Sequence, residues 1–128
     1  MKVEQVEQTI VMTEAQKRRF ADAPSRLSGD EEMLVTLASI AAENAPGLLE
    51  AMSGQLEHAD LSAYASSAHA VKGLLSTFET NHPVSDIQAA IDAARRGDQK
   101  ATRALHADLQ SPVRNLIAEI VAVTRLSA

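Results

Sequence analysis

Apolar residues recur at spacings of three and four along most of the 128-residue chain. That period places them on one stripe of an α-helix, whereas the period-two alternation of a half-buried strand is nearly absent. Helix-start residues divide the pattern into four long segments, which begin near Asp30, Asp60, Ser85 and Asp98. We therefore expect an all-α fold, an up-and-down antiparallel four-helix bundle with short loops.

The first long segment carries a proline within an otherwise continuous apolar stripe. Acidic residues in its first turn suit the positive end of the helix dipole. Because Pro46 removes one backbone hydrogen bond, we expect one long helix bent at Pro46 or two stacked halves. The positions expected in the core are Met33, Leu34, Leu37, Ile40, Ala41, Leu48, Leu49, Met52 and Leu56.

The second segment, from Asp60 to Asn81, is expected to be the central helix. At about 100° per residue its apolar side chains share one face, and His69 lies roughly 130° from the centre of that face, pointing outward. The expected seam comprises Leu61, Tyr64, Ala68, Val71, Leu75 and Phe78. The face around His69 carries the small residues Ser62, Ser66, Gly73, Ser76 and Thr80.

The last two segments have distinct start and stop residues. Ser85 and Gln88 have the spacing of a capping box. Gly97 suits a left-handed position after a helix, and Asp98 can cap the helix that follows. The expected stripes are Ile87, Ala90, Ile91 and Ala94 in the third helix, and Leu105, Leu109, Val113, Leu116, Ile120 and Val123 in the fourth, which contains Pro112.

The chain is expected to form one bundle domain, residues 26–128, preceded by an N-terminal extension, residues 1–25. Thr13 and Gln16 can form a capping box at the start of a short helix that runs to about Ala21 and stops before Pro24. We expect this helix to cover one end of the bundle.

Composition and charge narrow the classes of function. A net charge of −5 without a dense Lys/Arg cluster argues against a nucleic-acid binder. The chain has no cysteine, which excludes disulfides, thiolate catalysis and cysteine-based metal sites. No apolar run approaches transmembrane length, and the polar N-terminus lacks the apolar stretch of a signal peptide. We expect a cytoplasmic protein that does not bind a membrane.

The segment Ala68–Gly73 is the strongest candidate for chemistry. Neutral imidazole is a competent nucleophile toward phosphorus. One turn from His69, the Lys72 ammonium would attract each charge of a phosphorylated imidazole by about 3 kcal/mol at ~5 Å and an effective dielectric of ~20, before screening. A mid-helix glycine costs about 1 kcal/mol relative to alanine, so Gly73 indicates a need for clearance beside His69.

The run from His69 to Gly73 (His-Ala-Val-Lys-Gly) resembles the His-x-x-Lys-Gly signature of histidine-containing phosphotransfer (HPt) domains of bacterial two-component phosphorelays. The context is also similar: Ser28-Gly29-Asp30 precedes a helix, Pro46 lies within it, and Ala94-Arg95-Arg96-Gly97-Asp98 separates the last two helices. The resemblance covers about residues 26–125.

This resemblance implies a phosphorelay carrier rather than an autonomous enzyme. His69 would accept a phosphoryl group from a receiver-domain aspartate and pass it to another response regulator. Lys72 would stabilise the phosphoryl group, and Gly73 and Ser76 would keep the docking face clear. The expected partners are response-regulator receiver domains and a hybrid sensor histidine kinase. We expect a monomer with no cofactor of its own, magnesium being held by the receiver.

Two residues depart from the family pattern and keep other functions open. Leu74 stands where the family often has a small or polar residue, and Glu79 stands where it often has glycine. These departures favour a helical adaptor that binds receiver domains without being phosphorylated. A phosphoacceptor domain related to chemotaxis-type histidine kinases is a further alternative with the same bundle and motif.

The remaining candidate groups point to no second site. Glu79 and His82 have the spacing of half a di-iron motif, but the second Glu-x-x-His is missing, so we expect no metal site. His58, His82 and His106 lack neighbours like those of His69. Met33 and Met52 are expected to fill the core.

Overall fold

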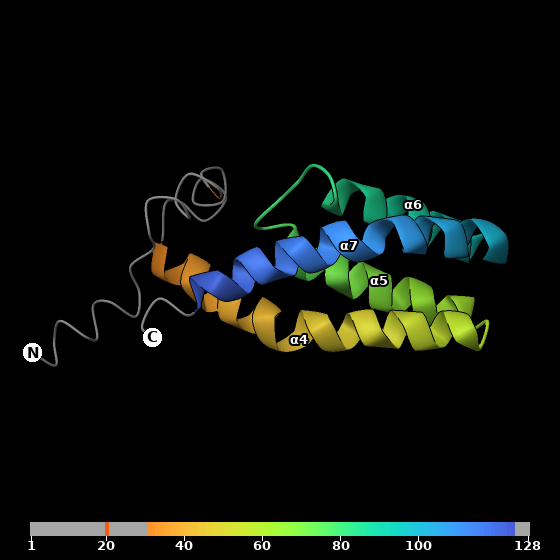
Figure 1. Ribbon diagram of the computed structural model, residues 1–128, viewed down its shortest axis with the longest axis horizontal. Helices are drawn as coiled ribbons and strands as arrows, with labels where there is room; N and C mark the ends of the chain where they lie inside the picture. Colours follow the sequence, from red (N-terminus) through yellow and green to blue (C-terminus); the bar gives the residue numbers. More distant parts are fainter. Residues whose placement is uncertain (1–19, 21–30, 125–128) are drawn as a thin grey trace, which may run out of the picture.

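All of the described secondary structure is helical. The computed structural model describes Phe20 and residues 31–124, and the helix labels follow Figure 1. The helices are α4 (Glu31–Glu57), α5 (Leu61–Leu75), α6 (Val84–Arg95) and α7 (Gln99–Val123). No strand occurs among these residues, so the all-α prediction is confirmed, and the arrangement fits a four-helix bundle.

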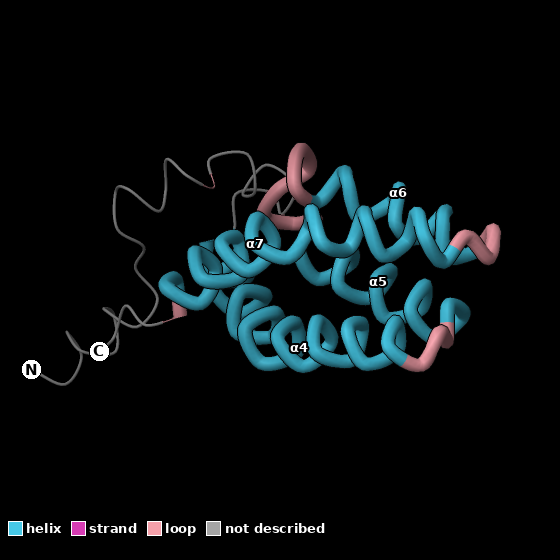
Figure 2. Tube along the Cα trace, turned by 45° about the vertical axis from the view of Figure 1, so that its right-hand side comes forward, coloured by secondary structure: helices cyan, strands magenta, loops and turns pink. Residues whose placement is uncertain are grey.

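The four helices lie side by side along the long axis of the molecule (Figures 1 and 2). Helix α4 packs against α5 and α7, and α6 packs against the same two helices. The short α4–α5 and α6–α7 connections lie at one end, and the longer α5–α6 connection lies toward the other (Figure 1). Helix α5 is therefore flanked by α4 and α6. None of the described helices is long and apolar enough to cross a membrane.

Each helix contributes one buried stripe to a common core. In α4 the stripe keeps spacings of three and four and consists of Leu34, Ala38, Ala41, Ala45, Leu49, Met52 and Leu56. The prediction that Met33 and Ile40 belong to this stripe is wrong, because they are 45% and 43% exposed. Each directly precedes a buried residue, and one residue turns a side chain by about 100° around a helix.

Both internal prolines are accommodated within continuous helices. Pro46 lies inside α4 and Pro112 lies inside α7. Of the two arrangements that Pro46 allowed, a single long helix is the one observed. The apolar stripes continue past both prolines, so packing compensates for the missing backbone donors.

The two short connections end their helices in the same way. At the end of α4 the Asp60 N–H donates to Gln55 O at 2.8 Å, and Ala59 has φ 55°. At the end of α6 the Asp98 N–H donates to Ala93 O at 3.0 Å, and Gly97 has φ 75°. Both are Schellman turns with a left-handed residue at C′. The predicted left-handed Gly97 is confirmed.

Each turn also supplies the cap of the next helix. Asp60 Oδ1 accepts from the Ala63 N–H at 3.1 Å, and Asp98 Oδ1 accepts from the Ala101 N–H at 3.0 Å. Both aspartate caps were expected from the sequence and are confirmed. They fix where α5 and α7 begin, and thereby the register of His69 on α5.

The paired turns give a stability prediction with opposite signs at two positions. Gly97→Ala places a β-carbon on a left-handed residue and should lower the free energy of unfolding by about 1 kcal/mol. Ala59→Gly removes the same strain and should raise it by a similar amount. Urea unfolding of both variants measures the difference, and a loss of stability in Ala59→Gly would contradict the account.

Helix α5 is shorter than the sequence predicted. It ends at Leu75 rather than Asn81, and in the turn that follows Leu75 O accepts from both the Phe78 and the Glu79 N–H, at 2.9 and 3.1 Å. Phe78 stays in the core although it lies beyond the helix. The helical section that carries His69, Lys72 and Gly73 is unaffected.

The predicted capping box at the start of α6 is wrong. The N-cap is Pro83, and no side chain caps the helix. The Gln88 side chain bonds instead to Lys72 of α5 and to Asp92, one turn further along α6. The Gln88 side chain, which the local pattern assigned to a helix cap, thus makes a contact between α5 and α6 instead.

The predicted N-terminal extension and its capping box at Thr13 and Gln16 lie outside the described residues, except for Phe20. Phe20 is 2% exposed, and its ring packs edge-on against Phe78, with centroids 5.6 Å apart. An edge-to-face aromatic pair of this kind contributes about 1 kcal/mol beyond its buried area. Phe20 therefore belongs to the same core as the α5–α6 connection.

Candidate functional site

His69 lies on the solvent side of α5, as its angular position predicted. Its neighbours in sequence, Ala68 and Val71, are fully buried, whereas His69 is exposed. On the same face Ser62, Ser66 and Gly73 are exposed as well. Small side chains thus surround the imidazole and leave it open to a large partner.

Lys72 is held toward α6 by a hydrogen bond across the two helices. Its Nζ donates to Gln88 Oε1 at 2.7 Å, and Gln88 Nε2 donates in turn to Asp92 Oδ1 at 2.9 Å. A lysine ammonium has three donors, so the bond to Gln88 leaves donors for a second acceptor. The chain from Asp92 through Gln88 orients Lys72 on the α6 side of the His69 face. The sequence placed Gln88 in a helix cap and did not predict its bond to Lys72, because that pairing depends on how α5 and α6 pack.

Gly73 leaves open space one turn beyond His69. A β-carbon built there would meet nothing within 4 Å, so neither packing within the bundle nor a left-handed backbone requires glycine. A glycine within a helix weakens it by about 1 kcal/mol relative to alanine, and the open space here is compatible with the predicted clearance beside His69.

Ser76 lies at the end of the predicted site. It is the C-cap of α5, and its hydroxyl donates to Gly73 O at 3.2 Å. The residue is half-buried. His69, Lys72 and Gly73 therefore lie in the C-terminal half of α5 and Ser76 caps its end; His69 and Gly73 are exposed, whereas Lys72 and Ser76 are half-buried.

A second histidine forms a polar cluster inside the bundle, which the sequence analysis missed. His106 of α7 is 8% exposed; its Nδ1 lies 3.1 Å from the Tyr64 hydroxyl and its Nε2 lies 3.2 Å from the Ser53 hydroxyl. Gln110 contacts the same Nε2. These neighbours differ from the lysine and glycine beside His69, and the sequence pattern gave no sign of them. Its position four residues after Thr102 and three before Leu109, both buried, was the pattern that could have placed it in the core.

Burial disfavours the charged forms of His106 and Tyr64. Burial, reinforced by the positive charge of Arg114, lowers the pKa of His106 below its ordinary value. Burial raises the pKa of Tyr64 to about 12. The adjoining cavity holds about 10 Å³, space for at most one water, so the cluster is a part of the core rather than a binding site.

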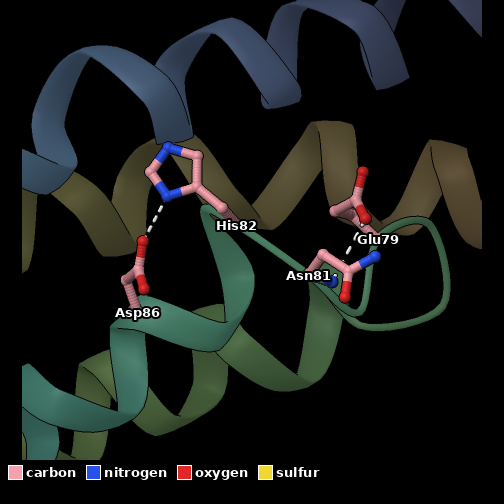
Figure 3. A network of polar contacts seen from close by, with 4 residues as sticks. All are labelled: Glu79, Asn81, His82 and Asp86. Atoms are coloured by element: carbon pink, nitrogen blue, oxygen red, sulfur yellow. Dashed lines mark hydrogen bonds and ion pairs between the residues drawn. The ribbon is translucent and has the colours of Figure 1, made fainter.

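The remaining histidines make local contacts at helix ends. His58 Nδ1 lies 2.8 Å from Gly54 O. His82 pairs with Asp86, whereas the Glu79 carboxylate accepts the Asn81 N–H, and the two side chains point to different partners (Figure 3). Glu79 and His82 are therefore not arranged as a metal site. In the described part of the chain no group of three or more His, Cys, Asp or Glu side chains could hold a metal ion.

Comparison of the chain with family models, curated proteins and solved structures found no match.

Proposed function

We propose that this protein is a phosphorelay carrier of the histidine-containing phosphotransfer kind. His69 is the phosphoacceptor, Lys72 stabilises the phosphoryl group, and Gly73 and Ser76 keep the docking face clear. One observation carries the proposal. An exposed imidazole stands on a face of small side chains, with an oriented ammonium one helical turn away.

The proposed step is a transfer between an acyl phosphate and an imidazole. A ring nitrogen of neutral His69 attacks the phosphorus of a receiver's aspartyl phosphate, the P–N bond forms, and the P–O bond to the carboxylate breaks. The carboxylate leaves with the electron pair, and the other ring nitrogen releases its proton to water. Lys72 donates to the phosphoryl oxygens, whose charge it balances at close range.

The division of labour follows from what surrounds His69. No second acid–base group faces it in the contacts described, so the magnesium and most of the transition-state stabilisation are expected from the receiver domain. The partners would be the receiver domains of a hybrid sensor histidine kinase and of a response regulator, in the cytoplasm. The carrier would act as a monomer. We further propose the up-and-down order of the bundle, supported by helix pairs that are neighbours in sequence and in space.

Intact-mass spectrometry tests the proposal. The purified protein is incubated with magnesium and a panel of receiver domains that have been phosphorylated chemically, and separately with phosphoramidate, a small phosphoryl donor. A gain of one phosphoryl group that is lost in acid, is stable in base and disappears in His69→Gln is expected. His58→Gln, which removes another exposed histidine, is the matched control and should label like the wild type.

Two results would contradict the carrier function. Labelling that persists in His69→Gln would place the phosphoryl group elsewhere. An unlabelled wild type that still binds a receiver domain would identify the protein as an adaptor.

A further inference from the structure

A hollow of about 330 Å³ lies between α5 and α6, lined by Ser62, Ala65, Ser66, Ala94, Arg95 and Gly97. Ser66 is one helical turn before His69 on α5, and Lys72 is one turn after it. Because Lys72 bonds to Gln88 of α6 at one level, and Ser66 and Arg95 line the hollow at the other, His69 stands between the ammonium and the hollow along α5.

The lining has the chemistry of an anion site. It supplies the guanidinium of Arg95 and the hydroxyls of two serines, and the other side chains are no larger than methyl. Arg95 is exposed, and its guanidinium makes no hydrogen bond or ion pair to any other residue of the described chain. A planar guanidinium beside hydroxyl donors matches the two oxygens of a carboxylate.

The acidic residues closest in sequence to the hollow have other partners. Asp60 Oδ1 and Asp98 Oδ1 accept from the N–H groups of Ala63 and Ala101, and Asp92 Oδ1 accepts from Gln88. The helix dipole favours a cation in the last turn of α6. It does not account for a cavity beside that cation, next to the face where a partner must dock.

We propose that the hollow receives an acidic side chain, Asp or Glu, of the receiver domain that docks over His69; this rests on the proposed function. Arg95 pairs with the carboxylate, and Ser62 and Ser66 donate to its oxygens. Lys72 contacts the phosphoryl group and Arg95 contacts the partner's surface, so the two cations on either side of His69 have separate tasks. Arg95 therefore selects among receivers, because a partner with a basic residue at this place meets a like charge.

The test compares two adjacent arginines. Arg96 is also exposed and has the same charge, but it does not line the hollow, so Arg96→Glu is the matched control for Arg95→Glu. The dissociation constant for a receiver domain is measured for both variants at two salt concentrations, together with His69 labelling by phosphoramidate. We expect Arg95→Glu to weaken receiver binding at least tenfold, Arg96→Glu to weaken it less than threefold, and phosphoramidate labelling to be unchanged in both.

Charge reversal on the partner identifies the pair. Each acidic residue on the docking face of the receiver is changed to lysine in turn, and one change should restore the binding of Arg95→Glu while weakening that of the wild type. Equal effects of the two arginine variants on receiver binding, or no effect of either, would overturn the inference. A wild-type protein that binds no receiver domain would overturn it as well. A wild type that binds a receiver through Arg95 but is not labelled on His69 would overturn the carrier function alone.

Discussion

Replacing Gly73 by leucine should yield a bundle at least as stable as the wild type that accepts phosphoryl groups from a receiver domain about a hundredfold more slowly. The position has ordinary helical backbone and open space, and leucine favours a helix over glycine by about 0.8 kcal/mol. The same side chain projects into the space beside His69 that a docked receiver would occupy. A displacement of about 1 Å at the reacting atoms is enough for a hundredfold loss in rate.

Two measurements on one variant separate these effects. Urea unfolding reports the gain in stability, and the rate of labelling by a receiver reports the obstruction. Labelling by phosphoramidate should stay within about twofold of the wild-type rate, because a small donor needs little space. Gly47→Leu is the matched control, since Gly47 lies in α4 with equally open surroundings and is remote from the motif in sequence. Receiver-dependent transfer at the wild-type rate in Gly73→Leu would show that the docking face lies elsewhere.

Acid should destabilise the bundle through His106 before most carboxylates titrate. The unfolded chain takes up a proton near the ordinary value of 6.5, whereas the folded state resists it because the pKa of His106 is lowered by burial and by Arg114. The contribution of His106 to the free energy of unfolding is therefore fully present above pH 6.5. Below it, stability falls by up to about 1.4 kcal/mol per pH unit until the folded pKa is reached.

Thermal or urea unfolding between pH 7.5 and 5.5 measures this slope. His69→Gln removes an exposed histidine and should retain the slope, whereas His106→Leu should flatten it while lowering stability at every pH, since Tyr64 and Ser53 lose a partner. A wild-type slope in His106→Leu would assign the acid sensitivity to another group.

Tyr64→Phe deletes a fully buried hydroxyl and should lower the free energy of unfolding by about 1–3 kcal/mol at neutral pH.

The sequence predicted well those features that depend on one helix at a time. Stripe spacing located α4, α5, α6 and α7 and the outward direction of His69, and the residues that cap α5 and α7 were recognisable locally. Errors arose where a residue one step from the stripe was assigned to it, as with Met33 and Ile40. The end of α5 was misplaced because Phe78 continues the apolar period beyond the helix.

Features that depend on two helices were beyond the sequence. The pairing of Lys72 with Gln88 needs the register between α5 and α6, and the contacts of His106 with Tyr64 and Ser53 need three helices. Ala59 adopts a left-handed backbone that its side chain does not favour, so only the turn geometry reveals it.

The hydrogen bonds of His106 also determine how α5 is rotated about its own axis within the bundle. Apolar side chains interlock but tolerate small rotations, whereas hydrogen bonds are directional, and Tyr64 ties α5 to α7 while Ser53 ties α4 to the same imidazole. Tyr64 and His69 are five residues apart, which places their side chains about 140° apart around the helix axis. With Tyr64 fixed inside the bundle, the direction in which His69 points outward is fixed too. The orientation of the exposed imidazole of His69 is therefore set by the buried imidazole of His106.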